Sequence, residues 1–150
     1  MFELKLTSGT IHLKWGYYAM KQFCAKYEVT NNGYFAILTP QYLLDQNNNP
    51  IPHLDEQGNK LTDDKGNVLY IVDSSKPTLL DYTSNFLLIG AEYAAAKLKS
   101  NKTFSEMEVC EWIDELGGVK AEGQIMDYLK YVIASHTTNL SEKEEAEKKS

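Results

Sequence analysis

Apolar and polar residues alternate at the start of the chain and follow a helical period over much of the remainder. Residues 2–14 predict a β-hairpin, because apolar side chains occupy every second position on both sides of a Thr-Ser-Gly-Thr turn. Residues 15–28 predict a helix with one apolar face. The Asn-Asn-Gly sequence at 31–33 is typical of a helix end, and a short apolar stretch follows it at 34–38.

Three more helices are predicted in the second half of the chain. Residues 79–99 are apolar nearly all round, which is typical of a helix at the centre of its domain. A Ser-x-x-Glu capping box at 105–108 begins the next helix, and the glycine pair at 117–118 ends it. The last helix is predicted over residues 119–136. Together these elements predict an α+β fold that is mainly helical, with an N-terminal β-hairpin packed on a bundle of about four helices.

Residues 41–77 differ from the rest because they hold three of the four prolines and many Asp, Asn and Gly residues. A weak repeat runs through them: Asp45, Asp55 and Asp63 each open a turn that ends in asparagine. Aspartate and asparagine stabilise such turns through the backbone, and glycine supplies the left-handed position. We therefore expect a β-rich arm inserted in a single domain over residues 1–138, followed by a charged, flexible tail over 139–150.

The first of these turns also partly matches a calcium loop. Asp45, Asn47, Asn49 and Glu56 occupy the first, third, fifth and twelfth positions of an EF-hand series. However, Pro50 stands where the series needs glycine, and no amphipathic helix flanks the segment. Turn chemistry is the preferred interpretation, with metal binding as the alternative, and we predict no metal and no cofactor.

The charge of the chain argues against nucleic acid as a partner. The net charge is −6, and all fifteen cationic residues are lysine. Arginine is the usual residue for bidentate phosphate and guanine contacts, so its absence is unfavourable for nucleic-acid recognition. No apolar run approaches the ~20 residues that a membrane span needs, and the N-terminus does not resemble a signal peptide. We expect a cytoplasmic protein without a membrane partner.

No group of residues predicts catalysis. Cys24 and Cys110 fall inside helical patterns, which predicts two reduced, mostly buried thiols. The three histidines lack metal-ligand spacing, and His136 lies on an apolar stripe where a hydrogen-bonded core histidine is the ordinary interpretation. The chain contains no nucleophile elbow, phosphate loop or dinucleotide fingerprint. We expect a protein that is not an enzyme.

Two groups of side chains are candidates for binding a protein partner. The helix that follows the capping box carries carboxylates on one side, which form either a solvated face or a docking surface for a basic helix. Exposed aromatic residues are enriched in interfaces, although those of the first helix alternatively cover the hairpin. The predicted partner-binding residues are the aromatic Trp15, Tyr18 and Trp112 and the acidic Glu108, Glu111 and Glu115.

The order of these elements resembles that of a known family. A hairpin at 2–14 runs directly into an aromatic-rich helix, a small-residue-rich segment follows at 87–96, and a capped helix ends in Trp-Ile-Asp-Glu-Leu at 112–116. This arrangement is similar to the tail assembly chaperones of long-tailed bacteriophages, which are encoded just before the tape measure gene. The resemblance covers about residues 2–38 and 79–135, whereas the arm departs from the family's usual short connection.

The resemblance implies a role in tail morphogenesis. Such a chaperone coats the long, helical, aggregation-prone tape measure protein until tail tube subunits polymerise around it. The implied partners are therefore the tape measure protein and, beyond it, the tail tube protein and a longer, frameshifted form of the chain itself. Apolar grooves between helices and an acidic surface suit that task.

Two other functions stay open. The chain is alternatively a structural virion component, such as a tail terminator or head–tail connector subunit, in which the arm adds a strand to a neighbouring subunit. A third hypothesis is a regulatory or immunity-type protein that binds one enzyme through its acidic helix. The sequence leaves the oligomeric state undetermined.

Overall fold

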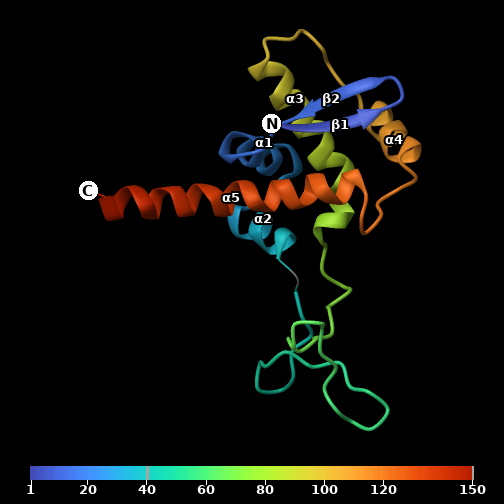
Figure 1. Ribbon diagram of the computed structural model, residues 1–150, viewed down its shortest axis with the longest axis vertical. Helices are drawn as coiled ribbons and strands as arrows, with labels where there is room; N and C mark the ends of the chain where they lie inside the picture. Colours follow the sequence, from blue (N-terminus) through green and yellow to red (C-terminus); the bar gives the residue numbers. More distant parts are fainter. Residues whose placement is uncertain (40, 150) are drawn as a thin grey trace.

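The computed structural model describes the backbone of residues 1–39 and 41–149, and the side chains as far as residue 136. Two strands, five α-helices and one 3₁₀ helix follow one another in that part of the chain (Figure 1). They are β1 (Phe2–Leu6), β2 (Gly9–Leu13), α1 (Tyr17–Tyr27), α2 (Asn31–Leu38), η1 (Leu79–Tyr82), α3 (Thr83–Lys97), α4 (Glu106–Glu115) and α5 (Gln124–Lys149). The predicted α+β, mainly helical fold is confirmed. Among the described residues, no helix is both long and apolar enough to cross a lipid bilayer.

The N-terminal hairpin is antiparallel and packs on the helices through one face. Phe2 lies opposite Leu13 and Leu4 opposite Ile11, so their apolar side chains share a face. Leu4 and Leu13 are buried. The other face is exposed and carries Glu3 joined to Lys5 by a salt bridge of 2.8 Å. The sheet therefore has two strands and a single buried side.

Helix α3 is the centre of the fold, as its all-round apolar pattern predicts. Most of its residues from Phe86 to Ala95 are buried, and it lies against β2, α1 and α4. Gly90 leaves room for the Tyr128 side chain of α5, because a Cβ atom at this position would collide with the Tyr128 hydroxyl. That hydroxyl donates a 2.7 Å hydrogen bond to the carbonyl of Phe86. Helices α3 and α5 are thus held at one fixed distance.

An aromatic cluster fills the space between α1, α2 and α3. Phe23 stacks on Phe86 with ring centroids 4.7 Å apart, and Trp15 lies 5.0 Å from Phe86. Trp15 is only 3% exposed, so the prediction that it projects toward solvent is wrong. The reason is that α1 begins at Tyr17, which leaves Trp15 in the short segment between β2 and α1, where its side chain is buried. By contrast, Tyr18 is exposed as predicted.

Helix α2 was not predicted. The Asn-Asn-Gly sequence at 31–33 forms the first turn of this helix and does not end the previous one. Thr30 caps the helix by accepting a 3.0 Å hydrogen bond from the N–H of Gly33. Helix α1 ends instead at Glu28, which adopts the left-handed conformation with φ of 55°. The apolar stretch after 33 therefore becomes helix, and its Tyr34 and Ile37 are buried.

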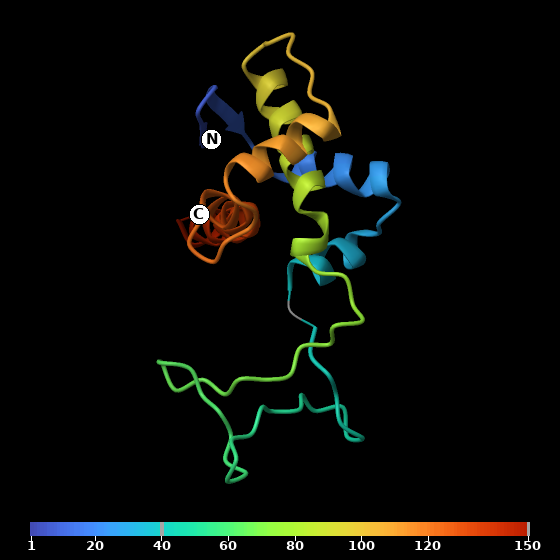
Figure 2. The same cartoon turned by 90° about the vertical axis from the view of Figure 1, so that its right-hand side faces the viewer.

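The arm, residues 41–77, projects away from the helices at the end remote from the hairpin (Figures 1 and 2). Its predicted repeat is confirmed, since Asp45, Asp55 and Asp63 build the same turn. In each turn the carboxylate oxygen Oδ1 accepts backbone N–H groups two and four residues later, at 2.8–3.0 Å. The residue three positions on has a positive φ, at Asn48, Gly58 and Gly66. Turn chemistry explains this segment, as the sequence favours.

Between the turns, the backbone closes into two triangles. In the first triangle, the N–H of Leu43 donates to the carbonyl of Ile71, and the N–H of Ile71 donates to the carbonyl of Ile51. The N–H of Ile51 donates to the carbonyl of Leu43, and all three distances are 2.8–3.0 Å. His53, Leu61 and Leu69 form a second triangle in the same way, with each bond at 2.9 Å. The arm therefore consists of isolated β-bridges around a common axis. Of residues 41–77, all of which the structure describes, none is buried.

Two other expectations concern the last helix. Helix α5 begins at Gln124 and not at residue 119, because residues 116–123 form turns that include Gly117 and Gly118 at positive φ. The helix also continues to Lys149, beyond the predicted end at residue 136, so the backbone of 139–149 belongs to α5. The side chains of the expected charged tail over 139–150 lie outside the described residues, and its flexibility stays a prediction.

Candidate functional site: an acidic groove between the hairpin turn and α4

Four of the six predicted partner-binding residues meet in one groove. The groove has a volume of about 280 Å³ and lies between the hairpin turn and α4. It is lined by Leu6, Ser8, Glu108, Glu111, Trp112 and Glu115. The lining holds no lysine or histidine, so three carboxylates surround a partly apolar floor.

The capping box holds one of these carboxylates in place. Ser105 Oγ accepts a 3.1 Å hydrogen bond from the N–H of Glu108, and Glu108 Oε1 accepts a 3.4 Å bond from the N–H of Ser105. The helix therefore begins where the sequence predicts. Successive turns of α4 then bring Glu108, Glu111 and Glu115 to one side, at spacings of three and four residues.

Glu115 joins the helix to the hairpin. Its carboxylate accepts a hydrogen bond from the backbone N–H of Thr7 at 3.3 Å and another from the Thr7 hydroxyl. This contact fixes the turn of the hairpin against the end of α4. Glu111 takes part in no hydrogen bond within the described residues, and it is exposed. Its charge therefore faces solvent in the groove.

The indole of Trp112 forms part of the groove floor. It is 8% exposed and packs edge to face against Phe104, with ring centroids 5.5 Å apart. Most of the ring belongs to the core, and only its edge borders the groove. An apolar edge beneath carboxylates suits an amphipathic segment that carries cationic side chains.

The other two predicted residues lie elsewhere. Trp15 is in the core, where its indole N–H donates to the hydroxyl of Tyr34 at 2.8 Å. Tyr18 is 54% exposed and packs on Tyr93 of α3, with ring centroids 5.1 Å apart. Tyr18 lines a separate shallow hollow of about 350 Å³ with Tyr93, Ala96 and Lys97. The structure thus does not bring Trp15 and Tyr18 together with Trp112.

Leu6 and Ser8 are groove residues that the sequence reasoning missed. Leu6 ends β1 and Ser8 lies in the hairpin turn; the alternating pattern indicates this hairpin, but it does not say which helix the turn contacts. The bond between Thr7 and Glu115 decides this, and those residues are 108 positions apart. A contact between residues so far apart in the chain leaves no local signal in the sequence.

The groups with the most perturbed pKa values belong to the core. Tyr34 accepts from Trp15, and its hydroxyl lies 2.7 Å from His136 Nε2. Burial raises the pKa of Tyr34 and lowers the pKa of His136. In the tautomer of His136 with its proton on Nδ1, the Tyr34 hydroxyl donates this bond to Nε2. The expectation of a hydrogen-bonded histidine on this helix is confirmed, and the arrangement is a satisfied network.

Neither the cysteines nor the acidic residues form a reactive or metal-binding centre among the described residues. Cys24 is half-buried, and burial raises the pKa of its thiol. Cys110 is exposed on α4, so the expectation of two mostly buried thiols is wrong for it. The apolar stripe of α4 turns Val109 and Trp112 inward and leaves Cys110 on the opposite side. No group of three metal-ligating side chains occurs in the part of the chain with described side chains.

Comparison with known proteins leaves the groove as the main guide to function. No family model matches the chain, and it matches neither a curated protein nor a solved structure.

Proposed function

We propose that the chain is a protein-binding domain that acts without catalysis, and that its acidic groove holds a basic, amphipathic helix of the partner. The observation that carries the proposal is the set of Glu108, Glu111 and Glu115 around the edge of Trp112, with no cation in the lining. Complementary charge would guide the partner to the groove and set its orientation. The apolar floor would then receive one side chain of the partner helix.

In its more specific form, the proposal is a phage tail assembly chaperone whose client is the tape measure protein. The support is the resemblance in element order, together with a groove that suits segments of a long amphipathic helix. A chaperone of this kind needs binding surfaces and a soluble, charged exterior, and it needs no catalytic group. The tape measure protein, the tail tube protein and a frameshifted longer form are the partners under this proposal.

The first experiment is co-expression with the large, coiled-coil-rich reading frame next to the gene. If the proposal holds, the large product is insoluble alone and forms a soluble complex with this chain. The charge-reversing variant Glu111→Lys is the sharpest probe, because Glu111 is exposed and bonds to no described residue. We expect it to weaken the complex about tenfold, roughly 1.4 kcal/mol, and to reduce the salt dependence of binding.

Glu56→Lys is the matched control, since it makes the same charge change on the exposed arm. If both variants lost the same affinity for the partner, net charge would explain the loss, and the proposal that the groove is the binding site would be wrong. A client that stays insoluble beside the wild-type chain would overturn the chaperone form.

The arm favours a second candidate, a structural virion subunit. Tyr42, Leu44, Leu54 and Val72 are all exposed, although they are large and apolar. An apolar surface of this kind on a projecting segment is typical of a contact with another subunit. Presence of the chain in purified virions, or assembly into closed rings, would favour this candidate over the chaperone.

A further inference from the structure

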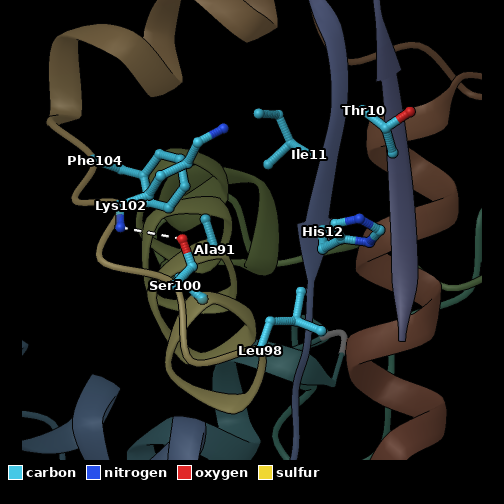
Figure 3. Close-up of a pocket in the computed structure, with 9 residues that line it drawn as sticks. Thr10, Ile11, His12, Ala91, Leu98, Ser100, Lys102 and Phe104 are labelled. Atoms are coloured by element: carbon cyan, nitrogen blue, oxygen red, sulfur yellow. Dashed lines mark hydrogen bonds between the residues drawn. The ribbon is translucent and has the colours of Figure 1, made fainter.

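Beside the outer edge of β2 lies a pocket of about 140 Å³ with an apolar floor. Ile11 of β2, Ala91 and Ala95 of α3, and Leu98 and Phe104 of the following segment form it. Figure 3 shows Ile11, Ala91, Leu98 and Phe104 on the side of β2 that faces away from its hairpin partner. The volume is below the roughly 300–1,000 Å³ of pockets for drug-sized ligands. It suits a single aliphatic side chain.

The backbone next to this pocket has unused hydrogen-bonding groups. In an antiparallel pair, residues alternate between bonding their partner and directing N–H and C=O outward. Lys5 of β1 is an outward residue, because its N–H and C=O both bond to the side-chain amide of Gln124, at 2.7 and 3.0 Å. Thr10 lies opposite Lys5, so its N–H and C=O leave the hairpin at the other edge, and the same holds for His12.

The two edges of the hairpin therefore differ. The edge of β1 is covered at Lys5, since the side-chain amide of Gln124 occupies the position that a neighbouring strand would take there. On the edge of β2, the N–H of Lys14 donates to the carbonyl of Gly90, but no described residue bonds the outward groups of Thr10 and His12. Both residues are exposed and line the pocket. An open edge of this kind accepts an added strand.

The charges at the pocket define the partner further. Lys102 lines it, and no aspartate or glutamate is among the lining residues. Lys14 directly follows β2, and its ammonium group lies 5.6 Å from the ring centroid of Tyr93. This environment is opposite in charge to the groove on α4 and favours carboxylates beside the inserted side chain.

We propose that the outer edge of β2 binds an extended, acidic segment of a partner protein as an added strand. One aliphatic side chain of the segment occupies the pocket, and a neighbouring carboxylate of the segment lies near Lys102. Backbone hydrogen bonds to Thr10 and His12 supply affinity, and the pocket supplies specificity. This site goes beyond the proposed function, because its surface, its charge and the partner's conformation all differ from those of the α4 groove.

The test uses the full chain and a capped peptide, acetyl-Thr-Glu-Leu-Glu-Thr-amide, followed by amide chemical shifts. We expect shifts at Thr10 and His12, and weaker binding of the same peptide with lysine in place of glutamate. Thr10→Pro removes one outward donor while keeping the bonds inside the hairpin, and should weaken binding about tenfold. Ala95→Leu fills the pocket and should weaken binding to a similar extent.

Glu3→Pro is the matched control, because Glu3 lies opposite His12 and its N–H leaves the hairpin at the β1 edge. This variant should bind the peptide as the wild type does. The proposal is overturned if the wild-type chain shows no shifts at millimolar peptide, if the shifts fall at Glu108 and Glu111, or if Thr10→Pro and Ala95→Leu, folded as judged by their spectra, bind normally.

Discussion

The arm and the helical body, residues 1–38 and 79–136, are stabilised in different ways. In the body, large side chains such as Phe23, Phe86 and Tyr128 are fully buried. In the arm no residue is buried, and the order comes from aspartate turns and two closed triangles of backbone hydrogen bonds. The body therefore depends on the volume of its side chains, whereas the arm depends on the local conformation of its backbone.

The difference shows how an inserted segment can keep an ordered backbone although it buries no side chain. Each turn satisfies its own backbone through one carboxylate, and a residue such as Gly58 supplies the left-handed position. Such a segment tolerates exposure on all sides. It leaves aliphatic side chains such as Leu44 and Leu54 exposed and available for another molecule.

The largest expected effect is the loss of a core ring. Phe86→Ala removes a side chain that contacts Phe23, Trp15 and Tyr34, and we expect a loss of about 3–5 kcal/mol in the free energy of unfolding. Leu44→Ala in the arm is the control and should change it by less than about 0.5 kcal/mol. Chemical denaturation measures both. Similar losses for the two variants would break the distinction between body and arm.

The second-largest difference in stability between body and arm should come from substitutions of glycine. Gly90→Ala places a Cβ against the Tyr128 hydroxyl, so we expect a loss of about 1–3 kcal/mol through overpacking. At Gly58 a Cβ meets no atom within 4 Å, and only its φ of 84° opposes alanine. Gly58→Asn should therefore be nearly neutral, because Asn48 occupies the same place in the first turn at φ 63°. Thermal unfolding would compare them.

A smaller effect should appear in the pH dependence of the free energy of unfolding of the body. Burial lowers the folded-state pKa of His136 below its usual 6.5, so the unfolded chain binds a proton more readily. Stability is then fully present above pH 6.5 and decreases as the pH falls through the lowered folded-state pKa. His136→Gln keeps an acceptor for Tyr34 and should remove this slope. Denaturation at a series of pH values measures it, and an unchanged slope would contradict the assignment.

The smallest effect concerns the arm alone. Hydrogen bonds from the backbone of Asn67, and then from its side chain and from Lys65, hold the pKa of Asp63 below 3.8. The third turn should therefore keep its full stability above pH 3.8 and loosen as the pH falls through the lowered folded-state pKa. Hydrogen exchange at Lys65 and Asn67 reports this locally. Asp63→Asn keeps both backbone bonds without the titration, and should show no such loosening.

Periodicity was sufficient for most of the body. The hairpin, α3 and the capped start of α4 follow from patterns that repeat over many residues, and the aspartate repeat predicts the turns of the arm. The α2 helix was missed because Asn-Asn-Gly suits both a helix end and a first turn, and the hydrogen bond from Gly33 to Thr30 decides between them. The burial of Trp15 depends on α1 beginning two residues later than its apolar face suggests.

The candidate site was only partly predictable for a related reason. Glu108, Glu111, Trp112 and Glu115 share one helix, so a helical period places them together. Tyr18 belongs to α1 and Trp15 to the segment before it, and no local pattern fixes how α1 and α4 are oriented relative to each other. Leu6 and Ser8 of the hairpin line the groove only because tertiary contacts place the hairpin beside α4, and the sequence pattern does not reveal those contacts.

The bridge between Tyr42 and Val72 has a consequence for how the chain folds. Helices α2 and α3 can meet only after the chain from residue 39 to residue 78 has closed into a loop. If the arm forms first, the bridge shortens the effective loop about fourfold. Each halving of loop length saves about 0.6 kcal/mol of closure entropy, so the saving is about 1.2 kcal/mol. A locally encoded arm would thereby act as a clamp that lowers the barrier to forming the body, while contributing little to its final stability.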